Sequence, residues 1–122
     1  MSTTHEWGGA MFALVVRFDV LPDHIEAFDA LVAETVAEIT ELESKTAVYV
    51  AHLRSDHLTE RVFYECYADE DAFAVHEGHY HTRRFLDQRG QHLARSPDVW
   101  RLNTIVGVIG GNQVENGFRS QG

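Results

Sequence analysis

Cysteine is nearly absent from this chain, which has only Cys66 among its 122 residues. A single cysteine excludes an intramolecular disulfide and a cysteine metal cluster, so a packed core must hold the fold together. This cysteine usage is compatible with a reducing compartment, and the N-terminus carries no signal-peptide pattern. We therefore expect a cytoplasmic protein.

Basic residues are also few: ten Lys and Arg stand against nineteen Asp and Glu, giving a formal net charge of −9. They are scattered, and Arg83-Arg84 is the only adjacent pair. A nucleic-acid binder needs clustered basic side chains to displace counterions from phosphates, and an anionic membrane surface attracts the same kind of cluster. We expect neither nucleic acid nor a membrane as a partner.

Long apolar runs and nucleotide-binding motifs are missing too. The apolar run over 11–16 ends at Arg17 and is far too short to cross a membrane. Gly8-Gly9 and Gly110-Gly111 lack the strand-glycine-helix context in which phosphates and dinucleotides bind. The sequence therefore predicts no nucleotide cofactor.

The chain does contain a clear succession of strand and helix patterns. Period-two alternation and β-forming residues predict four strands, which cover 11–20, 46–54, 61–68 and 99–109. Apolar spacings of three and four from Ile25 to Leu42 predict one long amphipathic helix. An acidic start at Asp69 predicts a short helix that Gly78 interrupts, and a further helix is expected over about 79–94.

These elements predict one α+β domain over 11–109, with a flexible N-terminus over 1–10 and a poorly ordered C-terminal tail over 110–122. The order β-α-β-β-α-α-β is the split βαβ, ferredoxin-like arrangement, in which helices cover one face of a four-stranded antiparallel sheet. Both faces of the expected strands carry apolar residues, as Val48 and Tyr49 illustrate. A sheet that is apolar on both faces needs a partner, so we expect a homodimer.

Titratable residues gather around the third expected strand and the helix interruption. Glu65 lies mid-strand among aromatic residues, where a charged carboxylate is costly unless it is paired. His76, His79 and His81 follow, and a neutral histidine can accept a proton near pH 7. Positions 76 and 81 of one helix diverge by about 140°, so a metal site would require a bend at Gly78. We predict no metal and interpret His79 as structural, whereas His76 and His81 remain open to either role.

One motif spans the same region. An aromatic-Tyr-Glu strand precedes an Asp and Ala helix start, and two histidines follow five residues apart, with an aromatic residue after the second. These positions are Phe63-Tyr64-Glu65, Asp69, Ala72, His76, His81 and Phe85. The motif resembles the signature of the antibiotic biosynthesis monooxygenase (ABM) family of dimeric α+β barrels, and the resemblance covers about residues 11–108.

The chain departs from the family pattern at three places. Glu43-Ser44-Lys45 stands where members usually carry Glu-Pro-Gly, Tyr80 replaces a common Pro, and Tyr67 replaces a frequent Trp. The haem-degrading branch of this fold relies on an Asn in the first strand and a Trp at the end of the third. Neither is present here, so we expect no haem and no other cofactor.

The resemblance implies cofactor-independent oxygenation of a small aromatic substrate, a polyketide-like phenol, hydroquinone or anthrone. A deprotonated phenol can pass one electron to O2, so the protein needs only to bind it, deprotonate it and exclude water. The candidate catalytic residues are His76 and His81 as bases, Glu65 as a buried carboxylate, and Arg84 for a developing oxyanion. The candidate substrate-binding residues are Tyr49, Tyr64 and Tyr67, for orienting hydroxyls, and Phe63, Phe73 and Trp100, for an apolar wall.

Two other functions fit the same residues. The fold also hosts isomerase-like or cyclase-like proton transfer on small keto compounds, and the Tyr64-Glu-x-Tyr67 and His76-x4-His81 pieces are similar to the branch that processes quorum-signal molecules. The third possibility is a dimer that binds a small molecule without turnover. Dependence on O2 separates the first function from the second, and the lack of any product identifies the third.

Overall fold

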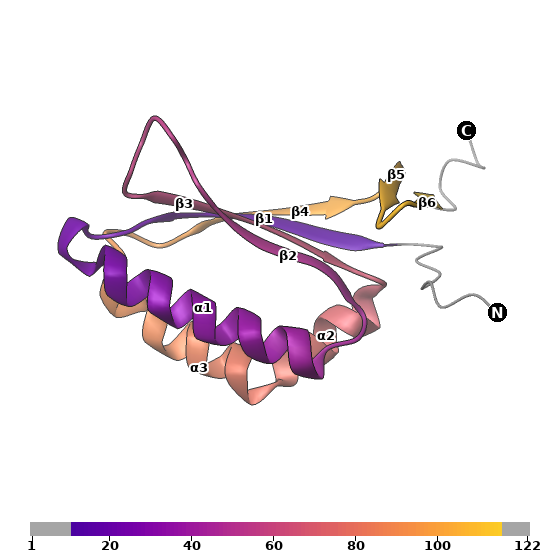
Figure 1. Ribbon diagram of the computed structural model, residues 1–122, viewed down its shortest axis with the longest axis horizontal. Coiled ribbons are helices and arrows are strands. Elements are labelled where there is room, and N and C mark those ends of the chain that lie inside the picture. The colour runs from indigo at the N-terminus through magenta and orange to yellow at the C-terminus, as the bar shows by residue number, and fades with distance from the viewer. Residues whose placement is uncertain (1–10, 116–122) are drawn as a thin grey trace.

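Three main helices lie on one side of an antiparallel sheet, and a short hairpin follows at the end of the chain (Figure 1). The computed structural model describes residues 11–115, so the flexible N-terminus expected over 1–10 and the tail beyond 115 lie outside the described residues. The helices are η1 (Pro22–His24), α1 (Ile25–Leu42), α2 (Glu70–Gly78), α3 (Tyr80–Arg89) and η2 (Gly90–His92). The strands are β1 (Phe12–Asp19), β2 (Thr46–Leu53), β3 (Glu60–Tyr67), β4 (Asp98–Asn103), β5 (Val106–Ile109) and β6 (Asn112–Glu115).

The main sheet has the strand order β2-β3-β1-β4, and all its neighbouring strands are antiparallel. This order confirms the expected α+β, ferredoxin-like fold. Glu65 of β3 lies opposite Leu14 of β1 on one side and Tyr49 of β2 on the other. Leu14 in turn lies opposite Arg101 of β4. Because residues paired in register point to the same face, these four side chains form one row across the helix-covered side of the sheet.

The core between sheet and helices depends on the alternation of β1. Phe12, Leu14, Val16 and Phe18 all point toward the helices and are buried. The ring centroid of Phe18 lies 4.7 Å from that of Phe63 and 5.3 Å from that of Phe28 in α1. Burying each such side chain contributes about 1.5–3 kcal/mol, so this layer holds α1 against the sheet.

A break divides the second helical region. The side chain of Asp69 accepts a hydrogen bond of 2.8 Å from the backbone N–H of Ala72, which confirms the expected start of α2. The helix ends at Gly78, and His79 is extended, with φ −72° and ψ 148°, before α3 begins. The helix expected over 79–94 ends earlier, since α3 stops at Arg89 and one short 3-10 turn follows. Among residues 11–115, no helix is both long and apolar enough to cross a membrane.

The last strands differ from the sequence prediction. The single strand expected over 99–109 is divided, because β4 ends at Asn103 and β5 begins at Val106. Gly110 and Gly111 have φ of +58° and +82°, the positive values that a tight hairpin turn requires and that glycine adopts without strain. The tail expected from residue 110 is therefore wrong for 112–115, which form β6 and pair with β5.

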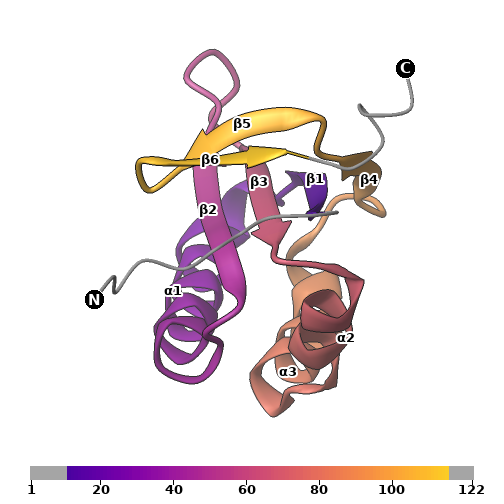
Figure 2. The ribbon, with the colours of Figure 1, turned by 90° about the vertical axis from the view of Figure 1, so that its right-hand side faces the viewer.

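The hairpin covers part of the second face of the sheet. Val114 of β6 is 1% exposed and packs against Met11, Ala13 and Cys66, on the side of β1 and β3 that faces away from the helices. Figure 2 shows β5 and β6 running across the direction of β2 and β3. The rest of this face stays exposed, with Val50 and Trp100 among its apolar side chains.

The packing of the hairpin gives a direct test. Val114→Ala removes two buried methyl groups and is expected to lower the free energy of unfolding by about 1–3 kcal/mol. Gln113→Ala, on the exposed side of the same strand, is the matched control and should change it by less than about 0.5 kcal/mol. Urea unfolding followed by circular dichroism measures both, and equal losses in the two variants would contradict the packing of β6 on the sheet.

Candidate active site

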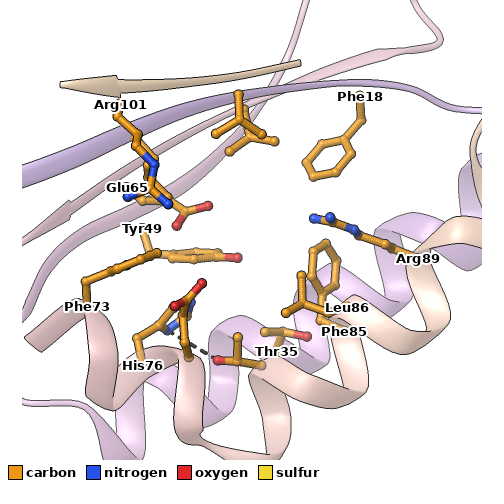
Figure 3. Close-up of a pocket in the computed structure, with 15 residues that line it drawn as sticks. Phe18, Thr35, Tyr49, Glu65, Phe73, His76, Phe85, Leu86, Arg89 and Arg101 are labelled. Atoms are coloured by element: carbon orange, nitrogen blue, oxygen red, sulfur yellow. Dashed lines mark hydrogen bonds between the residues drawn. The ribbon is translucent and has the colours of Figure 1, made fainter. Parts of the chain in front are cut away.

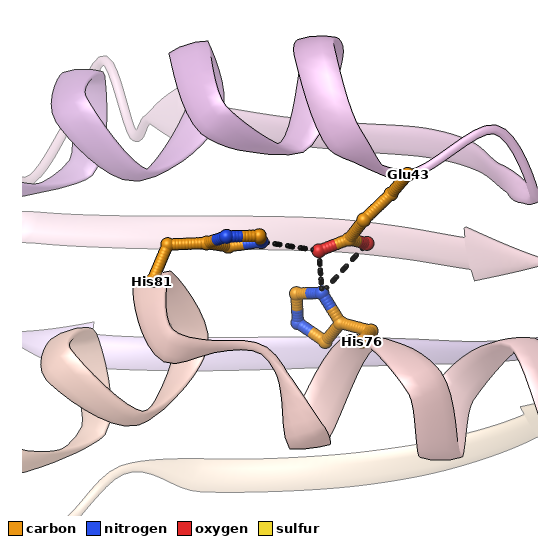
Figure 4. Close-up of side chains that lie close together, drawn as sticks. All are labelled: Glu43, His76 and His81. Carbon is orange, nitrogen blue, oxygen red and sulfur yellow. Dashed lines mark hydrogen bonds and ion pairs between the residues drawn. The ribbon is translucent and has the colours of Figure 1, made fainter.

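The clearest chemical feature is a buried carboxylate between two imidazoles (Figure 4). Glu43 caps the C-terminus of α1, His76 lies near the end of α2, and His81 lies in the first turn of α3. The two histidines can face one carboxylate because the chain breaks between them at His79. The bend that convergence requires is thus present, and it brings His76 and His81 together with a residue far from them in sequence.

Hydrogen bonds satisfy this carboxylate on all sides. Nδ1 of His76 lies 2.9 Å from each oxygen of Glu43, and Nε2 of His81 lies 2.5 Å from Oε2. The hydroxyl of Thr46 donates to Oε1. The side chains of Glu43 and His81 are 2% exposed and that of His76 is 5% exposed. Burial alone would raise the pKa of Glu43, but the bonds from His76, Thr46 and His81 outweigh it and lower this pKa to about 2.

Next to His76 a cavity of about 210 Å³ opens between the sheet and the helices (Figure 3). Its apolar wall includes side chains from every layer of the core: Leu14, Val16, Phe18, Phe73, Phe85, Leu86 and Val99. Polar atoms make up the smaller part of the cavity surface, and its eight polar lining residues come from both sides: Thr35, Tyr49, Glu65, His76, Glu77, Thr82, Arg89 and Arg101. A pocket whose surface is mainly apolar and on which polar side chains converge is typical of a site for a small organic molecule.

Glu65 lines this cavity from the sheet. Burial raises the pKa of its carboxyl, although Tyr67, which donates a 2.7 Å hydrogen bond to Oε1, and the nearby His76 oppose the shift. Burial and the negative charge of Glu65 raise the pKa of both Tyr49 and Tyr67 well above the usual value. These phenols therefore keep their protons: Tyr67 donates to Glu65, and Tyr49 is able to donate a hydrogen bond to a ligand.

Arg89 of α3 points into the cavity from the side opposite His76 (Figure 3). Its guanidinium lies over the rings of Phe18 and Phe85, with 5.6 and 5.9 Å from its central carbon to the ring centroids. Burial lowers the pKa of Arg89, and Tyr49 and Glu65 oppose this shift. No residue between 11 and 115 forms a hydrogen bond or ion pair with this guanidinium, so it is available to an oxygen of a ligand.

The structure gathers most of the residues predicted from the sequence. Four of them line the cavity: Tyr49, Glu65, Phe73 and His76. Phe63 and Tyr67 contact these residues from behind, and His81 is linked to His76 through Glu43. The ring of Tyr67 lies 5.1 Å from that of His76, and Phe63 is fully buried beside Tyr49.

Three predicted residues lie elsewhere. Arg84 faces α1, where its Nη2 lies 2.5 Å from Glu38, so it cannot stabilise charge in the cavity. Tyr64 and Trp100 point to the other face of the sheet, since they alternate with the cavity-facing Glu65 and Arg101. Tyr64 packs against the cluster around Met11, and Trp100 is half exposed.

The sequence prediction missed two polar groups that matter here, Glu43 and Arg89. One feature of the sequence could have drawn attention to Glu43, because the Glu-Ser-Lys turn stands where the resembled family usually has Glu-Pro-Gly and keeps the Glu. No such feature points to Arg89, since which side of α3 faces the cavity depends on how that helix rotates against the sheet.

A helix-covered ferredoxin-like sheet, with a mainly apolar cavity between the layers and a carboxylate-histidine cluster beside it, defines the class to which this chain belongs. Comparison with known proteins makes it specific: the family model described as antibiotic biosynthesis monooxygenase matches residues 11–88. The chain therefore belongs to the antibiotic biosynthesis monooxygenase family. No curated protein matches it significantly.

Solved structures agree on the fold. Rv0793 from Mycobacterium tuberculosis is 27% identical, with a TM-score of 0.72, over 78% of this chain and 95% of that one. A Caulobacter crescentus protein provisionally named an antibiotic biosynthesis monooxygenase is 21% identical, with a TM-score of 0.76, over 80% and 92%. A conserved protein from Methanosarcina mazei is 16% identical, with a TM-score of 0.71, over 75% and 90%. At such low identities the last two show the fold alone.

The raised pKa of Glu65 predicts that its buried carboxyl group lowers the free energy of unfolding at a pH where it is ionised. A group whose pKa is raised by folding stabilises the folded state below its unfolded pKa, here 4.5, and loses that contribution as the pH rises through the folded value. Glu65→Gln removes the titration and keeps an acceptor for Tyr67. The variant should therefore be more stable than the parent at pH 7 to 8, and urea unfolding from pH 4 to 8 measures this.

The matched control is Glu41→Gln, an exposed acid of α1. It should leave the slope of stability against pH unchanged between pH 5 and 8. A Glu65→Gln protein that is less stable than the parent at pH 7 would show that the cavity holds this carboxylate ionised, against the expected effect of burial.

Proposed function

We propose that this chain is a cofactor-independent monooxygenase that oxidises a small phenol or hydroquinone with O2. The observation that carries the proposal is the position of His76, which lines an apolar cavity and has its Nδ1 held by a buried carboxylate. Oxygenation of a phenol without a redox cofactor requires a general base beside an apolar pocket that binds the ring, and His76 stands in such a place.

His76 acts as the base through its second nitrogen. The carboxylate of Glu43 accepts a hydrogen bond from Nδ1–H, which fixes the ring and the tautomer and leaves Nε2 with a free lone pair. Among residues 11–115, Nε2 has no hydrogen-bond partner. The charge that the ring gains with a proton is compensated by the same carboxylate, in the manner of a carboxylate-histidine pair.

The reaction balances without a further reductant. Nε2 of His76 takes the hydroxyl proton, and the phenolate passes one electron to O2, which leaves a phenoxyl radical and superoxide. The two combine as a carbon–oxygen bond at a ring carbon that bears hydrogen, and the imidazolium returns its proton to the peroxide. Loss of that C–H proton with cleavage of the O–O bond gives the quinone and one molecule of water, so phenol and O2 become quinone and H2O.

Arg89 and Tyr49 complete the proposed site. The guanidinium of Arg89, which has no hydrogen-bond partner within 11–115, offers two donors to an oxygen on which negative charge develops, and such fixed donors stabilise that charge. Tyr49 keeps its proton because burial raises its pKa, and it donates a hydrogen bond to a second substrate oxygen. The volume of about 210 Å³ is below the roughly 300–1,000 Å³ of sites for drug-sized ligands, which favours substrates of one or two rings.

Proton transfer on a small keto compound is the second candidate function. His76 and Arg89 also suit this reaction, because His76 can take a proton from a carbon atom of the substrate while Arg89, on the opposite side of the cavity, binds the enolate oxygen. This reaction consumes no O2. An isomerase or cyclase would therefore keep its full rate under strict anaerobiosis, whereas the monooxygenase would stop.

1-Naphthol and other one-ring and two-ring phenols are suitable probes, with O2 uptake and quinone absorbance as readouts. We expect one O2 consumed per quinone formed, and under ¹⁸O2 one labelled oxygen in the product and one in water. His76→Ala should lower kcat/KM by about 10²–10⁴-fold because it removes the base. His57→Ala, an exposed histidine between β2 and β3, is the control and should keep parental activity. Equal rates for the two variants would contradict the role of His76.

We also propose that two copies of the chain pair through the sheet face that the helices leave uncovered. Val50, Trp100 and Leu102 are 41%, 50% and 40% exposed on this face, and Val106 and Val108 of the adjoining hairpin are exposed as well. Exposed apolar side chains on both edge strands and on the hairpin favour a partner that covers this face, and in an isologous dimer that partner is the same face of a second copy.

Trp100→Asp tests this pairing. The parent should have twice the 13.8 kDa mass of the chain in light scattering after size exclusion, and the variant should shift toward the single-chain mass. Val75→Asp places the same charge on an equally exposed residue of α2, on the helix side, and should leave the dimer intact. A parent protein of single-chain mass at micromolar concentration would refute the proposal.

A further inference from the structure

The cluster of Glu43, His76 and His81 has the composition of a metal site. One ring nitrogen each of His76 and His81 and one carboxylate oxygen of Glu43 all lie within 4.8 Å of one another. His76 belongs to α2, His81 to α3, and Glu43 caps the C-terminus of α1; each points its ligand atom toward the same small volume (Figure 4). The histidines belong to the motif that the sequence analysis singled out, whereas the carboxylate becomes evident only in the fold.

The spacing fits a small cation with little movement. Zinc lies about 2.0–2.2 Å from nitrogen and carboxylate oxygen, so tetrahedral ligands stand roughly 3.3–3.6 Å apart. The nitrogens of His76 and His81 lie 2.9 and 2.5 Å from the Glu43 oxygens. Separations only about 0.4–1.1 Å wider, within reach of side-chain rotation, would place a cation where the hydrogen bonds now lie.

The donor set selects the class of cation. Two imidazoles and one carboxylate suit Zn²⁺ and the neighbouring first-row divalent ions, whereas Mg²⁺ and Ca²⁺ prefer sites made of oxygen alone. The single negative charge of Glu43 offsets half of the charge of the cation. Thr46 donates to Oε1 of Glu43 and holds the carboxylate in place, as residues behind metal ligands commonly do. Three protein ligands leave at least one coordination position for water.

We propose that Glu43, His76 and His81 bind one first-row divalent cation, of which Zn²⁺ is the representative, in place of the hydrogen bonds that otherwise join them. Coordination needs the lone pair of Nδ1 of His76, so the hydrogen of the neutral ring moves to Nε2. Nε2–H cannot accept a proton from a substrate, and the bound cation therefore inhibits oxygenation. The inhibition rests on the proposed role of His76, but the binding does not.

To test the binding, the full chain is first freed of metal with a chelator. It is then titrated with ZnCl2 in a calorimeter. The parent should take up one Zn²⁺ per chain. Glu43→Gln and His81→Asn should each weaken it by at least about 100-fold, since even losing a residue behind the ligands costs about 10–100-fold. The matched control is His92→Asn, which removes a histidine from the other close pair, His24 and His92, with 3.0 Å between their Nδ1 atoms. This variant should bind as the parent does.

A measurement on the parent keeps the test independent of whether the variants fold. Crystals grown with ZnCl2 should show an anomalous peak at the zinc edge about 2.0–2.2 Å from Nδ1 of His76 and Nε2 of His81. A peak elsewhere, or parental binding no tighter than that of Glu43→Gln, would overturn the proposal. Zinc that binds at this site without slowing O2 uptake would overturn the inhibition and with it the base role of His76. Loss of activity in His76→Ala without any zinc binding would leave the proposed function standing and remove the metal site.

Discussion

The site depends on one constraint, the need to satisfy a carboxylate that has been taken out of water. Glu43 caps the C-terminus of α1, shortly before β2 begins. Without hydrogen-bond donors, burial at this position would raise the pKa of its carboxyl group and disfavour the charged form. Thr46 supplies one donor locally, and the other two come from α2 and α3. Two helices can reach a single carboxylate only because the chain breaks at His79. His76 therefore lies at the cavity because its ring is one of the hydrogen-bond donors that stabilise the buried carboxylate of Glu43.

The fold could be predicted because short-range patterns determine most of it. Period two over β1 and spacings of three and four over α1 assign both the element and its buried side, and the order of elements leaves few topologies. The hairpin was missed because two adjacent glycines suit a loose segment as well as a tight turn. What decides between them is Val114, whose contacts with Met11 and Cys66 are far away in sequence.

The candidate site could be predicted only in part, for reasons that differ between residues. Tyr64 and Trp100 lie away from the cavity for a reason that the sequence contains, because adjacent strand residues point to opposite faces and their neighbours Glu65 and Arg101 face the cavity. Arg84 and Arg89 lie five residues apart on α3 and face different ways, which only the rotation of that helix decides. Glu43 lies 33 and 38 residues from its two histidines, and no local pattern connects positions so distant.

The sheet order has a consequence for how a ligand enters. β1 is bonded on both sides and β3 lies next to it, whereas β2 and β4 are the edges of the main sheet. The floor of the cavity, Leu14 and Glu65, belongs to these inner strands, but Tyr49 and Arg101 belong to the edges. Edge strands fray with a smaller free energy than central ones, so amide hydrogens at the rim exchange before those of the floor. Brief local opening of the rim therefore gives access to the cavity while the centre of the domain remains folded.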